Sequence, residues 1–388
     1  MKKICIVTGN RAEYGLLKNL ISRIKIEKTT RLQIIATGSH LSKFYGNTYK
    51  EILKDGNTIN QKIDLQIKKN NSKLDTAKST SLAIQGFTNS YNELKPDIVV
   101  LLGDRYEIFA ATFAAMNMNI PVAHIHGGEK TFGSIDDHMR HAITKMSKWH
   151  FVSTLSYKKR VIQLGEVPKN IFYVGALAYE SILNQELVSK KLFEKYIKMK
   201  FKKNNFLLTF HPETSDKNFK IDTFNNLLDA ISTIKESTIL FTLSNADAGG
   251  GLINEKIKKF VKKNPLASVY FTSMGSKMYY SALKNCNIVI GNSSSGILEA
   301  PYFTTPSINI GDRQTGRLSA KSVIHSKKDR ISIINSIRKA IIINSKKNNK
   351  IYDNPYGKLK SSKKIIDVLK NINMSKVNTR KKFYDINQ

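Results

Sequence analysis

Side chains that can bind phosphate or transfer protons recur in one kind of place in this sequence, directly after short apolar segments. Glycine, acidic, basic, amide, hydroxyl or histidine residues follow seven such segments, at residues 9–13, 103–105, 124–129, 211–213, 244–247, 291–296 and 311–313. In an open parallel α/β sheet, ligands bind beyond the carboxyl ends of the strands. If the apolar segments are such strands, these groups belong to one ligand site.

A phosphate site is indicated by residues 291–296, Gly-Asn-Ser-Ser-Ser-Gly, which join an apolar segment to a predicted helix. Glycine lets the backbone approach a phosphate, the start of a helix presents unpaired N–H groups, and Ser293 and Ser294 add hydroxyl donors. Arg313 would add a charge-assisted contact, and Glu299 would accept from ribose hydroxyls. In the alternative interpretation the serines only cap a helix, and Glu299 is an ordinary first-turn acid. The Gly-Lys-[Ser/Thr] ending of a Walker loop is missing.

Carboxylates stand at the ends and starts of other predicted elements. Asp104 follows the almost wholly apolar residues 98–103, where a carboxylate is either a helix cap or a catalytic group. Asp136 and Asp137 open a predicted helix, and Asp136 stands one turn before Arg140, with which it can pair. A plain N-cap is the alternative for Asp136.

Two histidines are candidates for acid–base chemistry. His126 and Glu129 flank two glycines, and a flexible turn there would suit a residue that reaches into a cleft. His211 ends an apolar segment directly before Pro212. A lone histidine is more often structural than catalytic, but His211 belongs to the same set of strand ends, which favours a functional role. No set of His, Cys and Asp has zinc spacing, so we expect no metal.

Short apolar segments alternate with amphipathic helical patterns along almost the whole chain, which is typical of a parallel α/β sheet. The predicted strands are residues 3–8, 32–36, 98–102, 122–125, 150–153, 172–174, 206–210, 239–243, 268–271, 288–290 and 307–310. Residues 178–203 form a long lysine-rich helical pattern, interpreted as the crossover between two Rossmann-like halves. We therefore expect domains at residues 1–178 and 179–357, and a helical tail, residues 358–388, that packs back on the first half.

Composition narrows the class of protein. The chain has 388 residues, which suggests two domains, and 41% hydrophobic residues argue against disorder. Its formal net charge is +33, but the lysines are spread along the chain and lack interleaved aromatic residues, so we expect no nucleic-acid partner. A basic field would still favour a polyanionic substrate. No stretch of about 18 apolar residues and no signal peptide is present, so we expect no membrane span and a cytoplasmic location.

Taken together, the motifs resemble those of the hydrolysing UDP-N-acetylglucosamine 2-epimerases, in particular the NeuC type of sialic acid and capsule biosynthesis. The matching residues are 8–15, 103–109, 124–129, 140–147, 211–214, 291–296 and 311–314, and the resemblance extends over residues 3–383. It implies a GT-B fold, in which two Rossmann-like domains face a central cleft. The first domain would then carry the catalytic acids and the second would bind UDP. We also expect a homo-oligomer, either a dimer or a tetramer.

The resemblance also implies a reaction. UDP is eliminated across C1–C2 to give 2-acetamidoglucal, and water then adds with the opposite configuration at C2, so UDP-N-acetylglucosamine yields N-acetylmannosamine and UDP without a cofactor. By resemblance, Asp104 and Asp136 match catalytic acids, and His211 is counted with them. The residues that match substrate contacts are Arg11, Arg105, Arg140, His211, Asn245, Ser293, Ser294, Glu299 and Arg313.

His126 departs from the pattern of the wider family, because related enzymes carry a catalytic glutamate there; the NeuC-like subgroup also reads histidine. Either His126 takes the acid–base role or Glu129 swings in. The C4 substituent of the sugar is open as well, since enzymes of legionaminic acid synthesis look similar and take a 4-acetamido-6-deoxy sugar. A GT-B glycosyltransferase is a further alternative, but it would need an acceptor groove and one dominant base.

Overall fold

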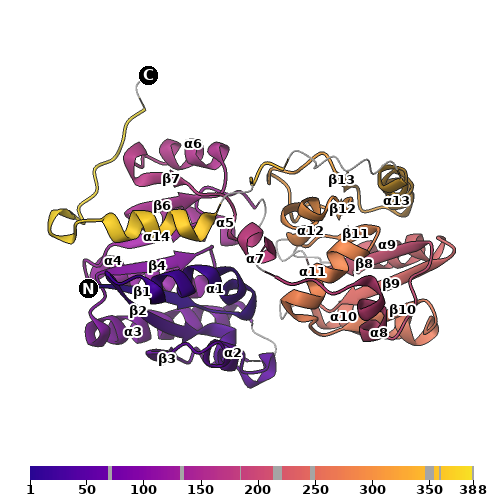
Figure 1. Cartoon of the computed structure of the whole chain (residues 1–388), viewed down its shortest axis with the longest axis horizontal. Helices are drawn as coiled ribbons and strands as arrows, with labels where there is room; N and C mark the ends of the chain where they lie inside the picture. Colours follow the sequence, from indigo (N-terminus) through magenta and orange to yellow (C-terminus); the bar gives the residue numbers. More distant parts are fainter. Residues whose placement is uncertain are drawn as a thin grey trace. The chain divides into compact units, whose positions relative to one another are not determined.

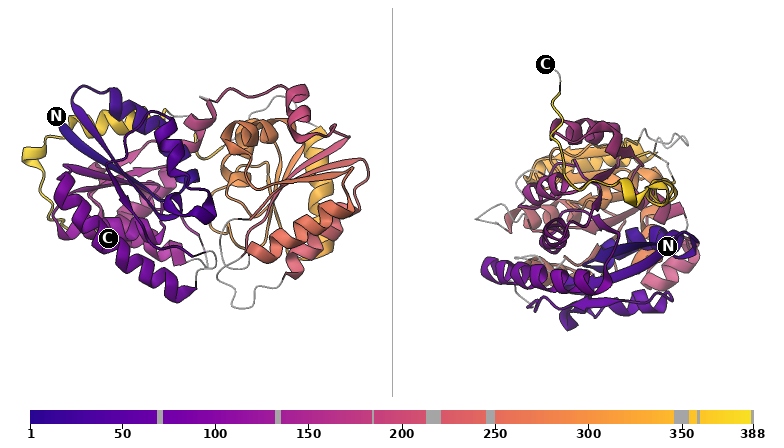
Figure 2. Two further views of the ribbon diagram at one scale, coloured as in Figure 1. Left: turned by 90° about the horizontal axis from the view of Figure 1, so that it is seen from below. Right: turned by 90° about the vertical axis from the view of Figure 1, so that its left-hand side faces the viewer.

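The computed structural model describes residues 1–68, 72–131, 135–183, 185–212, 221–244, 250–345, 354–357 and 360–386. Its contacts divide the chain into two compact units. The first unit comprises Met1–Glu129, Ile135–Ser181 and Tyr356–Gln388, and the second comprises Lys130–Ser134 and Ile182–Pro355. Each unit is an α/β layer structure with helices on both faces of a parallel sheet (Figures 1 and 2).

The first unit contains a 7-stranded parallel sheet in the order β3-β2-β1-β4-β5-β6-β7. Its strands are β1 (Lys2–Thr8), β2 (Thr30–Thr37), β3 (Gln61–Ile63), β4 (Ile98–Leu102), β5 (Val122–Ile125), β6 (Trp149–Val152) and β7 (Ile171–Tyr173). Its helices are α1 (Arg11–Ile26), α2 (Tyr49–Lys54), α3 (Lys73–Leu94), α4 (Tyr106–Asn117), α5 (Ile135–Met146), α6 (Leu155–Gln163), most of α7 (Leu177–Leu183) and α14 (Ser361–Asn371). Five short 3-10 turns complete the described chain at Gly38–Leu41, Lys43–Tyr45, Pro168–Asn170, Ala300–Phe303 and Met374–Lys376.

Both faces of this sheet are buried, because successive residues of a strand point to opposite sides. In β1, Ile4 and Ile6 contribute to the core shared with α1 and α14, whereas Cys5 and Val7 contribute to the core shared with α3 and α4. β1 pairs with β2 on one side and with β4 on the other. The strand order therefore reverses between β1 and β4, and the carboxyl ends of these two strands are the place where a ligand site is expected.

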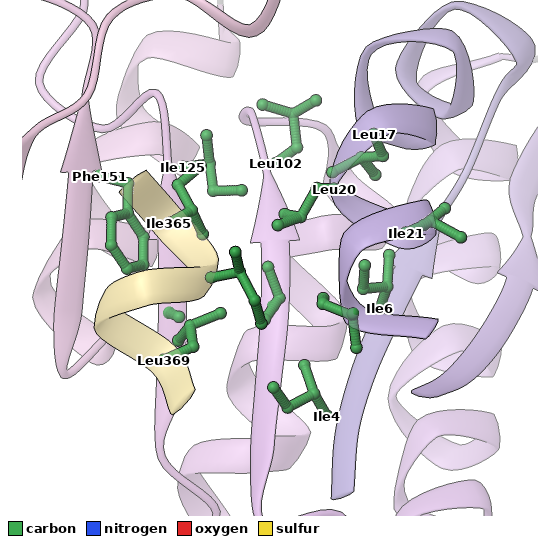
Figure 3. Packing of buried hydrophobic residues seen from close by; sticks show 14 of the residues in the cluster. Ile4, Ile6, Leu17, Leu20, Ile21, Leu102, Ile125, Phe151, Ile365 and Leu369 are labelled. Atoms are coloured by element: carbon green, nitrogen blue, oxygen red, sulfur yellow. The ribbon is translucent and has the colours of Figure 1, made fainter. Parts of the chain in front are cut away.

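The end of the chain belongs to the first unit. Ile365 and Leu369 of α14 are fully buried, and Figure 3 shows them in one cluster with Ile125 and Phe151 of the sheet. Farther on, the residues after α14 run along the same unit, where Lys381 donates to the carbonyls of Lys145 and Ser147, each at 2.6 Å. Lys381 thereby ties this final segment to the end of α5.

The second unit repeats the design with a 6-stranded parallel sheet in the order β10-β9-β8-β11-β12-β13. Its strands are β8 (Asn204–Thr209), β9 (Ser237–Thr242), β10 (Ser268–Phe271), β11 (Ile288–Gly291), β12 (Ser307–Ile310) and β13 (Val323–Ser326). Its helices are α8 (Lys190–Ile197), α9 (Asp222–Ser232), α10 (Gly250–Lys263), α11 (Gly275–Asn285), α12 (Ser295–Leu298) and α13 (Arg330–Ser345). The strand order reverses between β8 and β11, which again marks the expected ligand edge.

The structure departs from the sequence-based prediction at the sheet edges and in the crossover. β3 and β13 were not predicted, because Gln61–Ile63 is short and mostly polar and Val323–Ser326 has only two apolar residues. Residues 178–203 do not form one long helix: α7 and α8 are separate helices of 7 and 8 residues. The eleven predicted strands are confirmed, with boundaries shifted by no more than two residues.

Candidate active site

Asp104 lies one residue beyond the turn that ends β4, and a buried arginine holds it. The side chain of Arg140, on α5, is 3% exposed and donates to Asp104 Oδ2. The same guanidinium donates to Asp137 Oδ1 at 3.3 Å and to the carbonyl of Glu129 at 3.0 Å. The carboxylate of Asp104 is 21% exposed. One side of this carboxylate is therefore fixed by Arg140, and another side is open to a ligand.

His124, to which the sequence assigns no role, supports this arrangement through two hydrogen bonds. It is fully buried on β5, its Nε2 lies 2.7 Å from the carbonyl of Gly103, and its Nδ1 lies 3.1 Å from Thr144 Oγ1 on α5. Burial lowers the pKa of His124 to about 3, although the hydrogen bond to the Gly103 carbonyl acts in the opposite direction. The ring is therefore neutral and joins the turn before Asp104 to the helix that carries Arg140.

His126 and Glu129 form a second pair at the end of β5. His126 Nδ1 lies 3.7 Å from Glu129 Oε1, and that oxygen also accepts from Ser153 Oγ at 3.0 Å. His126 has a φ of +67°, a left-handed conformation that is unusual for a residue other than glycine and is concentrated at functional sites. The His126 side chain is 12% exposed and that of Glu129 is 5% exposed, so the histidine is the outer member of the pair.

The two glycines between His126 and Glu129 allow close approach of the chain. Gly128 has a φ of +78°, and a Cβ atom on it would lie 2.7 Å from the carbonyl oxygen of Tyr157. A side chain is excluded there on both grounds. The flexible turn expected from the sequence is instead a tightly packed one.

The remaining predicted residues of the first unit lie at the starts of α1, α4 and α5. Arg11 Nε binds Glu51 Oε1 at 2.9 Å, and Arg105 Nε binds Glu107 Oε1 at 2.7 Å. Asp136 is half-buried at the start of α5, beside Asp137. Arg140 pairs with Asp104 and with Asp137, so Asp137 joins the site.

In the second unit, residues 291–296 form a tight turn between β11 and α12. Gly291 has a φ of +140°, and a Cβ atom on it would lie 1.8 Å from the carbonyl oxygen of Thr209. Ser293 Oγ accepts from the backbone N–H of Ser295, and Tyr279 hydrogen-bonds to Ser295 through its hydroxyl. The helix that follows has only 4 residues, so its dipole is much smaller than the sequence suggested. Phosphate would be bound mainly by backbone N–H groups and serine hydroxyls.

Asn292, which the sequence did not single out, connects the polar loops of this unit. Its side chain exchanges two hydrogen bonds of 2.7 Å with the backbone N–H and carbonyl of His211. Its own carbonyl accepts from Arg313 Nη1 at 3.2 Å and from Gln314 Nε2 at 2.9 Å. Asn292 is fully buried, and it therefore holds His211 and Arg313 beside the glycine- and serine-rich turn.

Glu299 is the C-cap of α12 and not a first-turn acid. Burial raises the pKa of Glu299 to about 7, partly offset by the Tyr280 hydroxyl 3.5 Å away. The carboxyl group is thus poised to gain or lose a proton near neutral pH.

Asn245 lies outside the described residues. No group of three metal-binding side chains occurs among the residues that the structure describes, and in the same part of the chain no helix is long and apolar enough to span a membrane.

Comparison with known proteins assigns the chain to a family. The family model described as UDP-N-acetylglucosamine 2-epimerase matches residues 22–370. The chain belongs to the UDP-N-acetylglucosamine 2-epimerase family. It is therefore an enzyme of this family, and the predicted resemblance is confirmed.

Three named relatives are similar to this chain over most of their length. The GDP/UDP-N,N'-diacetylbacillosamine 2-epimerase (hydrolyzing) of Campylobacter jejuni is 46% identical over 325 residues, which cover 84% of each chain. The polysialic acid biosynthesis protein P7 of Escherichia coli is 39% identical and covers 100% of this chain and 98% of its own. The UDP-N,N'-diacetylbacillosamine 2-epimerase (hydrolyzing) of Legionella pneumophila is 34% identical over 96% of each chain.

Solved structures of the 2-epimerase family share the fold. The UDP-GlcNAc 2-epimerase from Neisseria meningitidis bound to UDP-GlcNAc matches with a TM-score of 0.79 and 19% identity, over 95% of this chain and 99% of that one. The UDP-N-acetylglucosamine 2-epimerase from Rickettsia bellii matches with a TM-score of 0.76 and 20% identity, over 95% and 96%. The predicted fold class, a GT-B-like pair of α/β domains with parallel sheets, is confirmed.

Proposed function

We propose that this 2-epimerase homologue is hydrolysing: it releases UDP from a UDP-linked 2-acetamido sugar and yields the free sugar inverted at C2. The supporting observation is the set of acid–base groups at the ligand edge of the first unit, where Asp104, His126 and Glu129 each have a fixed partner. Two of the similar relatives carry the word hydrolyzing in their names. Several acid–base groups on separate loops suit a reaction that moves protons at two stages.

In this scheme the bond between C1 and the phosphate oxygen breaks first, because the C2–H is only weakly acidic. A base then removes the C2 proton to give the glycal, and water adds to C1 while an acid returns a proton to C2 from the opposite face. We assign His126 to proton transfer, with Glu129 behind it as the group that orients the ring, since Glu129 Oε1 is already held by Ser153. Asp104 and Asp136 are the other proposed acid–base groups, and Arg140 holds the carboxylate of Asp104 in place.

The second unit is the proposed UDP site. His211 and Arg313, tied together by Asn292, would bind the diphosphate with Ser293 and Ser294. Negative charge grows on the departing phosphate, so donors arranged in advance lower the barrier as well as bind the nucleotide. Glu299 would accept from the ribose hydroxyls. Arg11 and Arg105 of the first unit, and Asn245, complete the proposed contacts.

For the substrate we favour UDP-N,N'-diacetylbacillosamine, because two relatives at 46% and 34% identity are named for it. UDP-N-acetylglucosamine, which would give N-acetylmannosamine for sialic acid or capsule synthesis, is the second candidate. The 39% identical relative named for polysialic acid biosynthesis supports it over the full length of the chain. The GDP-linked diacetylated sugar belongs in the same comparison, since one relative's name includes it.

The test is to incubate the protein with each of the three sugar nucleotides in deuterated water, without acceptor, and to follow the products by NMR. The proposal expects free UDP, or GDP from the GDP-linked sugar, and a free sugar that carries deuterium at C2. Retention of the original C2 hydrogen would rule out the elimination. A UDP-linked product with inverted C2 would identify a non-hydrolysing epimerase instead, and turnover that requires an acceptor would identify a glycosyltransferase.

A further inference from the structure

Two buried carboxylates lie at the junction of β1 and β4, and the proposed mechanism uses neither. Glu13 is in the first turn of α1 and Glu107 is in the first turn of α4. They are 7% and 1% exposed. Buried acids are rare unless they are paired, and among the residues that the structure describes Arg105 is the one cation that forms an ion pair with either of them.

The loops around Glu107 are shaped to admit its carboxylate. A Cβ atom on Gly9, after β1, would lie 2.6 Å from Glu107 Oε1, and one on Gly38, after β2, would lie 3.3 Å from it. Glu107 itself follows β4. The carboxylate is therefore enclosed by the ends of three neighbouring strands, and any side chain on Gly9 would displace it.

The hydrogen bonds divide the two acids into different roles. Glu107 Oε1 accepts from Arg105 Nε at 2.7 Å, and Glu13 Oε2 accepts from the backbone N–H of Gly9 at 3.1 Å. Glu107 Oε2 and Glu13 Oε1 are buried without a hydrogen-bond partner in the part of the chain that the structure describes. Burial raises the pKa of Glu13 well above its usual range, and the charge of Glu107 raises it further. Of the two acids, Glu107 is therefore the one that faces Arg105.

This arrangement costs folding free energy, because a buried carboxylate oxygen has lost its water. The partner of Glu107 has the opposite environment: the side chain of Arg105 is 45% exposed, and Arg105 directly follows Asp104. A bond to Nε fixes the plane of the guanidinium, and the fork formed by its terminal nitrogens matches a phosphate.

We propose that Glu107 is a positioning residue of the substrate site, which orients the guanidinium of Arg105 toward an anionic oxygen of the nucleotide sugar. Glu13 binds the backbone N–H of Gly9 instead, which leaves Glu107 as the acid that pairs with Arg105. The proposal rests on the proposed function, since that supplies the phosphate. It assigns Glu107 no contact with the substrate and no proton transfer.

A double-mutant cycle between Glu107→Gln and Arg105→Ala tests this, with KM for the sugar nucleotide and the Kd of UDP from calorimetry as readouts. Glu107→Gln is expected to raise both about tenfold, with a smaller fall in kcat. Combined with Arg105→Ala, it is expected to add nothing further. The double variant should also melt at a higher temperature than Arg105→Ala, because it no longer buries an unpaired carboxylate. Equal, additive losses in the two backgrounds would overturn the proposal.

A second experiment displaces the carboxylate of Glu107 without substituting Glu107 itself. Gly9→Ala pushes directly on Oε1, so the UDP Kd should rise as it does in Glu107→Gln. Gly15→Ala, in α1, is the matched control, because a Cβ atom there has no described neighbour within 4 Å. Unchanged UDP binding in a folded Gly9→Ala variant would contradict the proposal. If the wild-type protein hydrolyses none of the sugar nucleotides, the proposed function fails, and the UDP titrations still decide the role of Glu107.

Discussion

At the scale of single residues, the structure distinguishes side chains that position other site residues from side chains that can contact the substrate. Arg140 was predicted as a substrate contact, but it is almost completely buried and binds Asp104, Asp137 and a backbone carbonyl. We therefore propose that it acts on the substrate through Asp104. His124 has the same supporting position, and because its pKa is far below neutral it does so without a charge.

Asp104→Asn should separate a catalytic role from a structural one. Loss of the carboxylate is expected to lower kcat by about 100-fold or more, the usual scale for an acid–base group. Arg140 keeps Asp137 and the Glu129 carbonyl, so the melting temperature should fall little. Steady-state kinetics and thermal unfolding are measured together, with Asp229→Asn on the exposed side of α9 as the control. A variant with normal turnover and a much lower melting temperature would show that Asp104 is only a cap.

Glu299 should make UDP binding depend on pH. A ribose hydroxyl donates better to a carboxylate than to a carboxylic acid, so UDP should bind more tightly as the pH rises through about 7, where Glu299 ionises. Calorimetric titration at several pH values measures this, and Glu299→Gln removes the contribution while UDP keeps its own titration. Identical pH profiles for the two proteins would exclude Glu299 from the nucleotide site.

Glu299 should also make the stability of the fold depend on pH, but here a rise in pH should be unfavourable. Its pKa is higher in the folded than in the unfolded protein, so the folded state binds more protons between the two values and loses stability as the pH rises through that window. Above about pH 7, Glu299→Gln should be more stable than the wild type by about 3 kcal/mol, because the pKa shift from 4.5 to about 7 corresponds to 1.36 kcal/mol per pKa unit. Below about pH 4.5 the advantage should vanish. Denaturant unfolding at the two extremes tests the sign.

At the scale of elements, the short turns at strand ends position the proposed phosphate-binding residues more than the helix ends do. The turn after β11 requires a glycine at its first position, since Gly291 is in a conformation with a φ of +140° and faces the Thr209 carbonyl. α12 is a single turn, so the position of the serines is set by this strand end and by Asn292.

Gly291→Ala should destabilise the second unit by several kcal/mol, because it combines an unfavourable φ with a backbone clash. Gly296→Ala is the matched comparison within the same turn. A Cβ atom there would meet its nearest neighbour at 3.6 Å, an ordinary contact, so stability should change by less than about 1 kcal/mol. Denaturant unfolding of the two variants gives the difference, and equal losses would contradict the clash.

At the scale of the whole molecule, the chain returns to the first unit at its end. Glu166 is 2% exposed, accepts a hydrogen bond from His150 Nε2 at 2.9 Å, and forms ion pairs with Lys145 Nζ at 2.8 Å and Lys381 Nζ at 2.6 Å. Phe383 covers Gly165, and the Tyr384 N–H donates to the Gly165 carbonyl at 2.9 Å. The final segment thus adds to the support of α5, which carries Arg140 and Asp137.

Lys381→Met should lower the free energy of unfolding by about 2–4 kcal/mol, somewhat less than the loss of a sole partner, because Glu166 keeps Lys145 and His150. Lys382→Met, at the next and exposed position, serves as the control and should have almost no effect. Because α5 carries part of the proposed site, kcat should fall with Lys381→Met below its melting transition. Equal stability of the two variants would mean that the final segment does not hold the unit.

The sequence by itself determined the strands and the residues that follow them. Both depend on short-range patterns: a buried parallel strand is a continuous apolar run, and polar residues at its end can be read directly. That was enough to predict two α/β halves, a ligand edge and the family. The edge strands β3 and β13 were missed because a strand with one exposed edge and few apolar residues has no such pattern.

Only the tertiary structure decided which side chains meet. Arg140 and Asp104 are 36 positions apart, and Lys381 reaches carbonyls 236 and 234 positions away. No local pattern encodes such pairings, since they depend on how helices from distant parts of the chain lie on one sheet. The same holds for Glu107, because only the tertiary structure places its carboxylate against Gly9 and Gly38. Residue type and spacing predict where polar groups gather, but burial and distance determine which of them bind a ligand and which bind each other.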